Sequence, residues 1–414
     1  MRKRGTLVLA VLLSFALLAA ACGDDDAETV TEPEPAAAEP EEEMAEPEEE
    51  MAEPEEEMAE PEEEMAEPEE EMAEPEEEMA EPEEMAEPEM TDISVGLVFD
   101  IVGRGDQSFN DSAAAGIERA AAELGITFTE ASPNEDGSNR GELLQLAADA
   151  HDVVVAVGFL FEGDAAAVGS ENPDTMFGVV DSGMINFGAD PPAPYGDNIA
   201  GLVFAEEQGS FLVGAAAALK TETGTIGFIG GVANVGGLIE RCEAGYQAGA
   251  RAVNPDIEII SAYVTQAPDF DGFNAPDRGK EIALAMYEDG ADIVYHAAGG
   301  TGAGLFLAAQ EQSEATGSKV WAIGVDSDQY HTAGAGVQDY ILTSMLKRVD
   351  VSIFEMVRSA IEGNVTAGPT VYDLSVDGVG YSTSGGFVDD IADQLEDFKA
   401  QIVSGAIVVP KEPS

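Results

Sequence analysis

From Ile93 onward, short apolar runs rich in Val and Ile alternate with longer, Ala-rich stretches of helical character. Near-continuous apolar runs of this kind are typical of strands in a parallel sheet, because helices cover both faces of such a sheet. The alternation occurs as two consecutive series. We therefore predict an α/β fold with two doubly wound parallel-sheet lobes.

The apolar runs and the stretches between them define the expected elements. In the first series, strands are expected at 93–100, 126–130, 152–159, 175–181 and 198–204, and helices at 111–124, 138–150, 162–170 and 206–220. In the second series, strands are expected at 225–231, 257–264, 291–298, 319–326 and 340–346, and helices at 237–253, 277–289, 303–315 and 349–362. The tail adds a strand at 370–376 and a last helix near 386–404.

The first 22 residues have the pattern of an export signal. Basic residues at positions 2–4 precede an apolar stretch, residues 7–21, that is shorter than a usual membrane-spanning helix. The small residues before Cys22 resemble a bacterial lipobox, in which the cysteine is lipidated and becomes the first mature residue. The alternative is a soluble protein whose signal peptide is cut nearby. Since Cys242 is the one other cysteine, lipidation of Cys22 leaves no disulfide.

Between residues 22 and 92 the composition predicts a disordered tether. Residues 44–90 repeat the unit MAEPEEE with a period of seven. A coiled coil is disfavoured because each unit carries a proline and only one large apolar residue. Repulsion between the glutamates and the stiffness of proline predict an extended segment that holds the folded part away from the membrane.

The acidic charge of the chain restricts its partners. The formal net charge is −67, and 35 of the 84 acidic residues lie between Asp24 and Glu89. From residue 91 onward the chain still has 49 acidic and 14 basic residues. Because the phosphates of nucleic acid require clustered Lys and Arg, we do not expect nucleic acid as a partner.

Residues that follow the apolar runs are the candidates for a site, because ligands of open α/β sheets bind beyond the carboxyl ends of the strands. These residues combine carboxylates, aromatic rings, amides and glycines: Asp100, Phe109, Asn110, 158–161, Asp181, 230–231, 299–304, Asp326, Asp328 and Lys347. Carboxylates accept hydroxyl or amide protons, and Lys347 would compensate their charge. For each aspartate taken alone, a helix N-cap is the alternative role.

The glycine-rich stretch AAGGTGAG, residues 297–304, follows an expected strand and begins an expected helix. Its glycines do not match the spacing of a dinucleotide-binding loop, and we expect Gly300 and its neighbours to let the backbone approach a ligand. The three histidines have no metal-ligand spacing, and no catalytic motif occurs. We therefore expect no enzymatic activity, no metal and no cofactor, and a core or supporting role for His296.

Six stretches in this chain resemble the basic membrane protein family of substrate-binding lipoproteins, which are similar to purine-nucleoside receptors of ABC transporters. Together they extend across nearly all of residues 93–365, in family order. The stretches are DQSFNDSAAAGIERAAAELGI, EEQGSFLVGAAAALKT, IGFIGG, PDRGKEIALAMYEDGADIVYHAAGGTGAGLFLAA, AIGVDSDQ and LTSMLKRVD.

The resemblance implies a periplasmic-binding-protein fold of class I, a Venus flytrap whose two lobes are joined by three hinge crossings. We place these crossings near residues 204–206, near 344–346 and near Pro369. The expected division of the chain is a signal peptide (1–21), the tether (22–92), an N-terminal lobe (93–205 with 346–368) and a C-terminal lobe (206–345 with 369–414).

The resemblance also implies a purine nucleoside in the cleft between the lobes. Phe109 of the SFN motif and Phe273 of the opposite lobe would sandwich the base. The segment around Phe273 departs from the family pattern and carries extra residues, so Phe270 is an alternative for the second ring. Asn110 and Asp181 would face the polar edge of the base, and the ribose hydroxyls would be held by Asp100, Asp326 and Lys347.

These expectations describe a lipid-anchored solute-binding protein of an ABC importer, on the extracytoplasmic face of the cell membrane. It would be a monomer that delivers a purine nucleoside to permease subunits. One alternative is the same fold with another small polar ligand, such as a sugar-like compound or a signal molecule, acting as a sensor for a membrane receptor. Another is a nucleoside-cleaving enzyme, which would require an acid or metal cluster that we do not find in the sequence.

Overall fold

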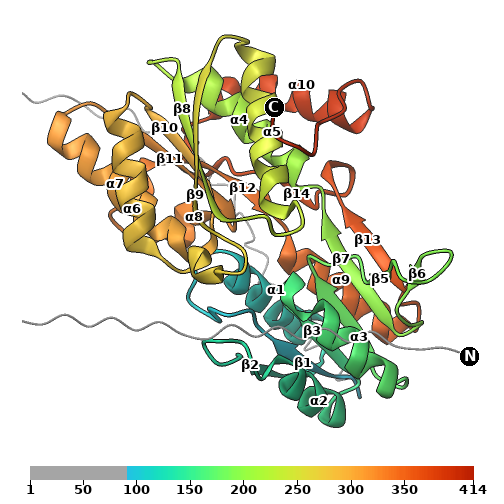
Figure 1. Cartoon of the computed structure of the whole chain (residues 1–414). Helices are drawn as coiled ribbons and strands as arrows, with labels where there is room; N and C mark the ends of the chain where they lie inside the picture. Colours follow the sequence, from blue (N-terminus) through green and yellow to red (C-terminus); the bar gives the residue numbers. More distant parts are fainter. Residues whose placement is uncertain (1–90) are drawn as a thin grey trace, which may run out of the picture. The chain divides into compact units, whose positions relative to one another are not determined.

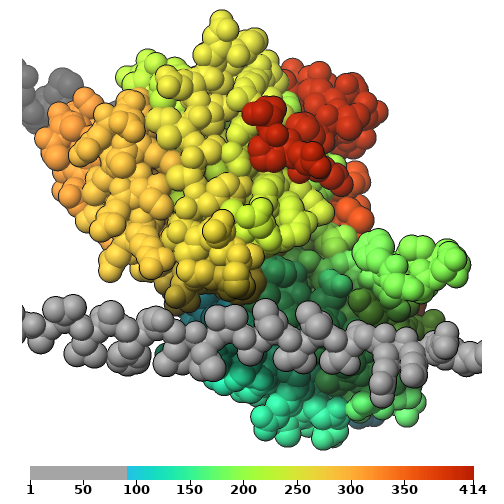
Figure 2. Space-filling model, in the orientation of Figure 1, coloured from blue at the N-terminus to red at the C-terminus, as the bar shows by residue number. Residues whose placement is uncertain are grey.

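The computed structural model describes residues 91–414, which contain two six-stranded sheets, each in its own lobe (Figure 1). The predicted fold class, two parallel-sheet α/β lobes, is confirmed. In the space-filling view, residues 91–204 are blue to green and the central part of the chain is yellow to orange (Figure 2). The signal peptide, Cys22 and the tether up to residue 90 lie outside the described residues. Within 91–414, no helix is long and apolar enough to cross a membrane.

The first sheet has the strand order β13-β7-β4-β3-β1-β2, and every pair in it is parallel. Its strands are β1 (Ser94–Val98), β2 (Thr127–Ala131), β3 (Val153–Ala156), β4 (Met176–Val180), β7 (Ile199–Phe204) and β13 (Gly368–Tyr372). Its helices are α1 (Phe109–Leu124), α2 (Arg140–Ala150), α3 (Glu162–Glu171) and α9 (Val349–Glu362), with a 3-10 turn η1 (Phe159–Phe161).

The second sheet has the order β14-β12-β11-β10-β8-β9, with the β12–β14 pair antiparallel and the others parallel. Its strands are β8 (Thr225–Ala233), β9 (Glu258–Gln266), β10 (Ile293–Ala297), β11 (Trp321–Asp326), β12 (Ile341–Lys347) and β14 (Val379–Tyr381). The helices are α4 (Glu206–Lys220), α5 (Leu238–Val253), α6 (Pro276–Glu288), α7 (Gly302–Thr316), α8 (Gln329–Thr332) and α10 (Ala392–Val403). A small antiparallel hairpin, β5 (Ile185–Asn186) and β6 (Ala193–Pro194), follows β4.

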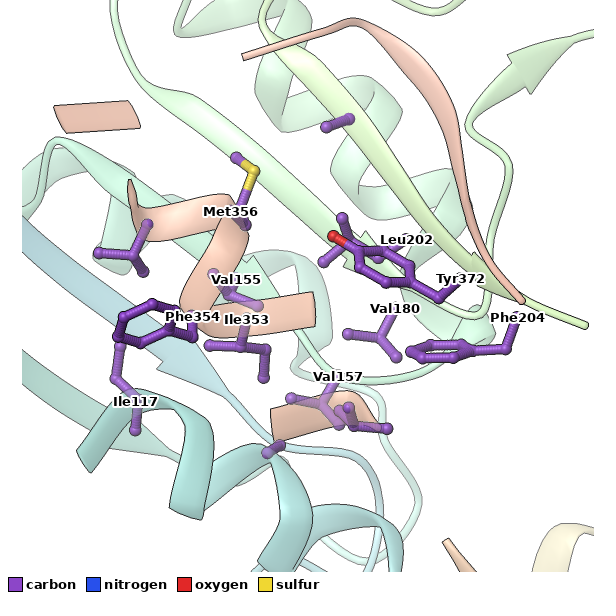
Figure 3. Packing of buried hydrophobic residues seen from close by; sticks show 14 of the residues in the cluster. Ile117, Val155, Val157, Val180, Leu202, Phe204, Ile353, Phe354, Met356 and Tyr372 are labelled. Atoms are coloured by element: carbon purple, nitrogen blue, oxygen red, sulfur yellow. The ribbon is translucent and has the colours of Figure 1, made fainter. Parts of the chain in front are cut away.

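Both faces of each sheet are buried, since successive side chains of a strand point to opposite faces. In the first lobe, Val155 packs into the core under α1 and α9, and Val154 packs into the core under α2 and α3. Ile117 of α1 and Phe354 of α9 lie on the same side as Val155 (Figure 3). The pairs α4–α5 and α6–α7 cover the second sheet in the same way.

Helices α4 and α5 approach each other backbone to backbone. A Cβ on Gly245 of α5 would overlap the carbonyl oxygen of Glu207, and a Cβ on Gly214 of α4 would overlap that of Tyr246. Glycine is therefore required at both contacts. This packing fixes the start of α4, where Glu206 lies.

The chain crosses between the sheets three times. The first crossing is at Ala205, between β7 and α4, where it was predicted. The second comes after Lys347, because that residue ends β12 of the second sheet. The third comes after Tyr372, because β13 pairs with β7 of the first sheet. By strand membership, residues 346–347 lie in the second sheet and residues 369–372 in the first, whereas the expected division assigned them the other way round.

The tail also differs from the prediction. The strand expected at 370–376 ends at Tyr372, and the turn η5 (Leu374–Val376) follows it. The helix expected near 386–404 begins only at Ala392, because two 3-10 turns, residues 384–386 and 389–391, precede it and Gly385 in the first has a φ of 81°. Left-handed backbone of this kind does not continue into an α-helix.

Candidate functional site

A cavity of about 750 Å³, part of it open to solvent, lies between the two lobes. The structure places all eight predicted ligand residues on its wall: Asp100, Phe109, Asn110 and Asp181 from the first lobe, and Phe273, Gly300, Asp326 and Lys347 from the second. The alternative ring, Phe270, is not part of the wall.

Hydrogen bonds join the polar side chains of the turn between β1 and α1 to one another and to its backbone. Asn110 accepts a hydrogen bond through Oδ1 from the backbone N of Asp100 (3.0 Å) and donates one through Nδ2 to Asp106 (3.0 Å). Asp106 also accepts bonds from three backbone nitrogens of the turn, so it caps the start of α1. One amide proton of Asn110 is left for a ligand. The network also fixes Phe109, the first residue of α1.

Three aromatic rings line the cavity: Phe109 and Phe159 from the first lobe, and Phe273 from the second. Phe109 has Lys347 Nζ 4.9 Å from its ring centre. Phe273 is the last residue of the 3-10 turn η2 (Phe270–Phe273) and borders the cavity. Phe270 instead meets Phe159 of the first lobe edge-on, with ring centres 6.2 Å apart. The geometry therefore gives the two phenylalanines of η2 different positions.

Asp181 and Asp326 occupy similar places in the two lobes. Asp181 directly follows β4, Asp326 ends β11, and both have a φ of 64°. Left-handed backbone is uncommon outside glycine, and residues held in it cluster at ligand sites. Asp326 also accepts a hydrogen bond from Ser108 Oγ of the first lobe at 2.6 Å. This bond joins the lobes.

Lys347 supplies a positive charge to one corner of the cavity. Its Nζ lies 2.7 Å from Asp181 and 3.6 Å from Glu206 Oε1, and the three side chains are at most 6% exposed. Burial alone would lower the pKa of Lys347, but the surrounding carboxylates outweigh it and raise the pKa above its usual value. Lys347 is therefore a permanent cation of the site.

Burial raises the pKa of three carboxyl groups on the cavity wall. The pKa of Asp100 and that of Asp326 rise to about 6, and that of Glu206 rises to about 7, because the interior desolvates the charged form. Lys347 opposes the shift at Glu206 and Asp326. Above pH 7 the carboxylates of the wall outnumber its one lysine. Such a wall favours a ligand rich in hydroxyl and N–H donors over a phosphorylated one.

Three ionisable residues of the wall were not predicted: Asp106, Glu206 and Cys242. Glu206 lies two residues beyond β7, so the rule that identifies Asp181 at a strand end also applies to it. Cys242 lies inside α5, where its sequence context predicts only a small core residue. Burial raises the pKa of its thiol well above the usual value, so the group is uncharged.

His296 lies behind the cavity wall. Its side chain is 1% exposed, and Nε2 is 3.0 Å from Gln329 Oε1. Burial lowers the pKa of His296 to about 4, so the ring is neutral at pH 7. Across residues 91–414, no group of three His, Cys, Asp or Glu side chains is arranged to hold a metal ion. The site can bind through hydrogen bonds, charge and aromatic faces.

The chain is similar to known proteins over most of the described part. The family model described as "ABC transporter substrate-binding protein PnrA-like" matches residues 93–413. A "CD4+ T-cell-stimulating antigen" of Listeria monocytogenes is 34% identical, over 78% of this chain and 89% of that protein. The "ABC transporter nucleoside-binding protein BmpA" of Lactococcus lactis is 30% identical, over 78% and 90%. "Basic membrane protein A1" of Borrelia garinii is 31% identical, over 74% and 85%.

Solved structures show the same fold. An ABC transporter solute-binding protein from Aeropyrum pernix matches with a TM-score of 0.64 and 27% identity, over 77% of this chain and 94% of that one. A second solute-binding protein, from Conexibacter woesei, has a TM-score of 0.60 and 20% identity, over 77% and 99%. The two-lobed architecture is thus that of solute-binding proteins.

Proposed function

The chain belongs to the family of PnrA-like ABC transporter substrate-binding proteins, and from this premise we propose that it captures a purine nucleoside between its lobes. Its relative from Lactococcus lactis is a nucleoside-binding protein by name, which supports this ligand class. The observation that carries the proposal is a wall that combines aromatic rings from both lobes with several carboxylates.

In this proposal, Phe109 and Phe273 sandwich the base. A purine has two π-faces, and stacking a base on an aromatic side chain contributes about 1–3 kcal/mol. Because Phe273 lines the cavity and Phe270 does not, Phe273 is the better candidate for the second ring. Asp181 and the remaining amide proton of Asn110 then face the polar edge of the base.

The ribose would lie against Asp100, Asp326 and Lys347, with Gly300 letting the backbone approach. Carboxylates can accept bonds from neighbouring hydroxyl groups, and bonds to a charged acceptor are the stronger kind. Each lobe supplies about half of the contacts, so the full set exists only when the lobes are closed. Ligand binding therefore favours the closed form, which the permease would recognise.

A thermal-shift screen of nucleosides, bases, sugars and amino acids tests this proposal. Guanosine, adenosine or inosine should raise the melting temperature of the purified chain. If all three fail while a sugar or an amino acid succeeds, the nucleoside assignment is wrong. Incubation with inosine should release no free base, because the proposed function is binding without chemistry.

The proposal also includes the N-terminal region. Lipid on Cys22 would anchor the monomeric chain to the extracytoplasmic face of the membrane, and the acidic repeat would space the lobes from it. The Cys22→Ser variant should then appear in the soluble fraction of cells. Continued membrane attachment of this variant would count against lipidation.

A further inference from the structure

In the described part of the chain, two carboxylate oxygens of the cavity wall lack a hydrogen-bond partner, Asp181 Oδ1 and Glu206 Oε2. Asp181 Oδ1 has the Lys347 ammonium 2.7 Å away, whereas Glu206 Oε2 has no cation so close. Among residues 91–414, no group donates to Glu206 Oε2, although this oxygen is buried. The Glu206 side chain is only 3% exposed and lies on the wall beside the predicted ligand residues. Buried polar atoms are nearly always paired in folded proteins, so an unpaired one at a cavity indicates a ligand that supplies the bond.

The two cations beside Glu206 are too distant to supply that bond. Lys347 Nζ is 3.6 Å from Oε1, and an Nη of Arg241 is 3.8 Å from Oε2. Hydrogen bonds between nitrogen and oxygen span about 2.7–3.2 Å. Lys347 makes its short contact with Asp181 instead, at 2.7 Å. Glu206 and Lys347 thus lie on one wall with their charged groups near each other but not bonded.

We propose that Glu206 and Lys347 together bind one hydroxyl group of the ligand's sugar, and that Glu206 makes the site selective for that hydroxyl. A hydroxyl oxygen can accept a bond from Lys347 Nζ while its proton is donated to the Glu206 carboxylate. An N–H group could satisfy Glu206 but not Lys347, and a carbonyl could satisfy Lys347 but not Glu206. This inference rests on the proposed function, since it takes the ligand to be a nucleoside.

The charge state of Glu206 controls this bond. The charged groups that influence it are Lys347 of β12, Asp181 beyond β4 and Arg241 of α5. Burial and Asp181 raise its pKa, whereas Lys347 and Arg241 lower it, and the result is about 7. Only the carboxylate forms the stronger, charge-assisted bond. Preference for the hydroxyl should therefore weaken as the pH falls from 8 to 6.

The adjacent residue offers a matched control. Glu207 is also buried, also has an unpaired Oε2, and lies 3.5 Å from a lysine, Lys411. It is on the same turn of α4 but is not part of the cavity wall. Replacing Glu207 by Gln thus repeats the loss of a buried charge without touching the cavity.

The test is a calorimetric titration of the full chain with a purine ribonucleoside and its 2′-deoxy, 3′-deoxy and 5′-deoxy analogues. The wild type should bind one of the analogues at least tenfold more weakly than the ribonucleoside. In Glu206→Gln, the ribonucleoside should bind about tenfold more weakly, while the affinity for that analogue changes less than threefold. Glu206→Met, which removes the acceptor, should abolish the discrimination, and Glu207→Gln should retain it.

The results separate this inference from the function on which it rests. The inference is overturned if Glu206→Gln and Glu206→Met weaken the binding of the ribonucleoside and of all three analogues by the same factor, or leave all four affinities unchanged. Glu206 then makes no selective contact. The proposed function survives that result. If the wild type binds no nucleoside at all, the proposed function fails and the inference fails with it.

Discussion

The two lobes share one architecture, but the polar side chains that each contributes to the cavity are positioned by different hydrogen bonds. In the first lobe, Asn110 is bonded to Asp100 and to Asp106, so the polar groups of the β1–α1 turn fix one another within the lobe. In the second lobe, two polar side chains of the wall, those of Asp326 and Lys347, take partners from across the cleft. Asp326 accepts its bond from Ser108, and Lys347 is paired with Asp181.

This difference indicates which half is preformed. The β1–α1 turn keeps its geometry by bonds inside one lobe. Asp326 and Lys347 of the second lobe gain these partners only when the lobes meet. Further bonds across the cleft follow the same pattern. Gln329 Nε2 and Thr332 Oγ1 donate to the carbonyl oxygen of Gln107 at 3.0 and 2.8 Å, and Ser327 Oγ donates to that of Ser108. We therefore expect closure and ligand capture to be linked through the turn at 107–108.

Removing the bridging cation should have the largest effect. Lys347→Met leaves Asp181 and Glu206 buried without their cation, and breaking one partner of a buried pair costs about 3–5 kcal/mol. We expect the free energy of unfolding, measured with urea at pH 7.5, to fall by that amount. Nucleoside binding should weaken at least a hundredfold. Lys399→Met is the control, because Lys399 pairs with Asp377 at the surface, where a pair contributes about 0–1 kcal/mol. Equal losses in both variants would contradict the role given to the lobe-bridging pair.

Removing one ring from either lobe should come next. Phe109→Ala and Phe273→Ala should each weaken nucleoside binding by about 10- to 100-fold, since each loses a stacking contribution of about 1–3 kcal/mol. Calorimetry on the folded fraction measures this. Phe270→Ala should change the affinity less than threefold, because that ring contacts Phe159 rather than the cavity. A larger loss in Phe270→Ala than in Phe273→Ala would reverse the assignment of the second ring.

The Ser108→Ala variant tests the link between closure and capture. It removes the bond to Asp326, and bonds to charged groups contribute about 1.5–3 kcal/mol. We expect roughly tenfold weaker binding, mainly through faster dissociation in stopped-flow measurements. The control is Ser112→Ala, because Ser112 Oγ accepts a bond from Asp350 within the first lobe. Dissociation that is equally fast in both variants would show that bonds across the cleft have no special part.

A smaller effect concerns the pH dependence of stability without ligand. The pKa of Glu206 is about 7 in the folded chain, against an ordinary value of 4.5. Between these values the folded state holds a proton that the unfolded state has released, so this group destabilises the wild type progressively as the pH rises. Glu206→Gln has no ionisable group at this position and so lacks this pH-dependent destabilisation. Its free energy of unfolding relative to that of the wild type should increase from pH 5 to pH 8 by at most about 3 kcal/mol. A difference that is flat or falls with pH would contradict the raised pKa.

Most of the fold could be predicted from the alternation of apolar runs. The bounds of α4 and α9 agree with the prediction because each has clear apolar spacing between two strands. The third crossing could not be found this way. β13 is a short strand with exposed residues at its centre, and its place beside β7 depends on pairing with residues far away in sequence. The antiparallel β14 has only three residues and no pattern of its own.

The sequence predicted those site residues whose positions are determined by the carboxyl end of a strand. Asp181, Asp326 and Lys347 all end or follow strands whose carboxyl ends meet the cavity. The choice between Phe270 and Phe273 was not predictable, because both lie in one turn and only its fold decides which ring borders the cavity. The hydrogen bonds of Asn110 within the turn could not be predicted either, because they depend on how the turn folds back on itself.

The most direct test of the central claim is a calorimetric titration of the purified wild-type chain with guanosine, adenosine and inosine. We expect one binding site per chain and a Kd of about 1 µM or tighter for at least one of these nucleosides. That affinity should be lost when Phe109 and Phe273 are both replaced by Ala. No binding of any of the three at millimolar concentration, or full affinity in the double variant, would contradict the account.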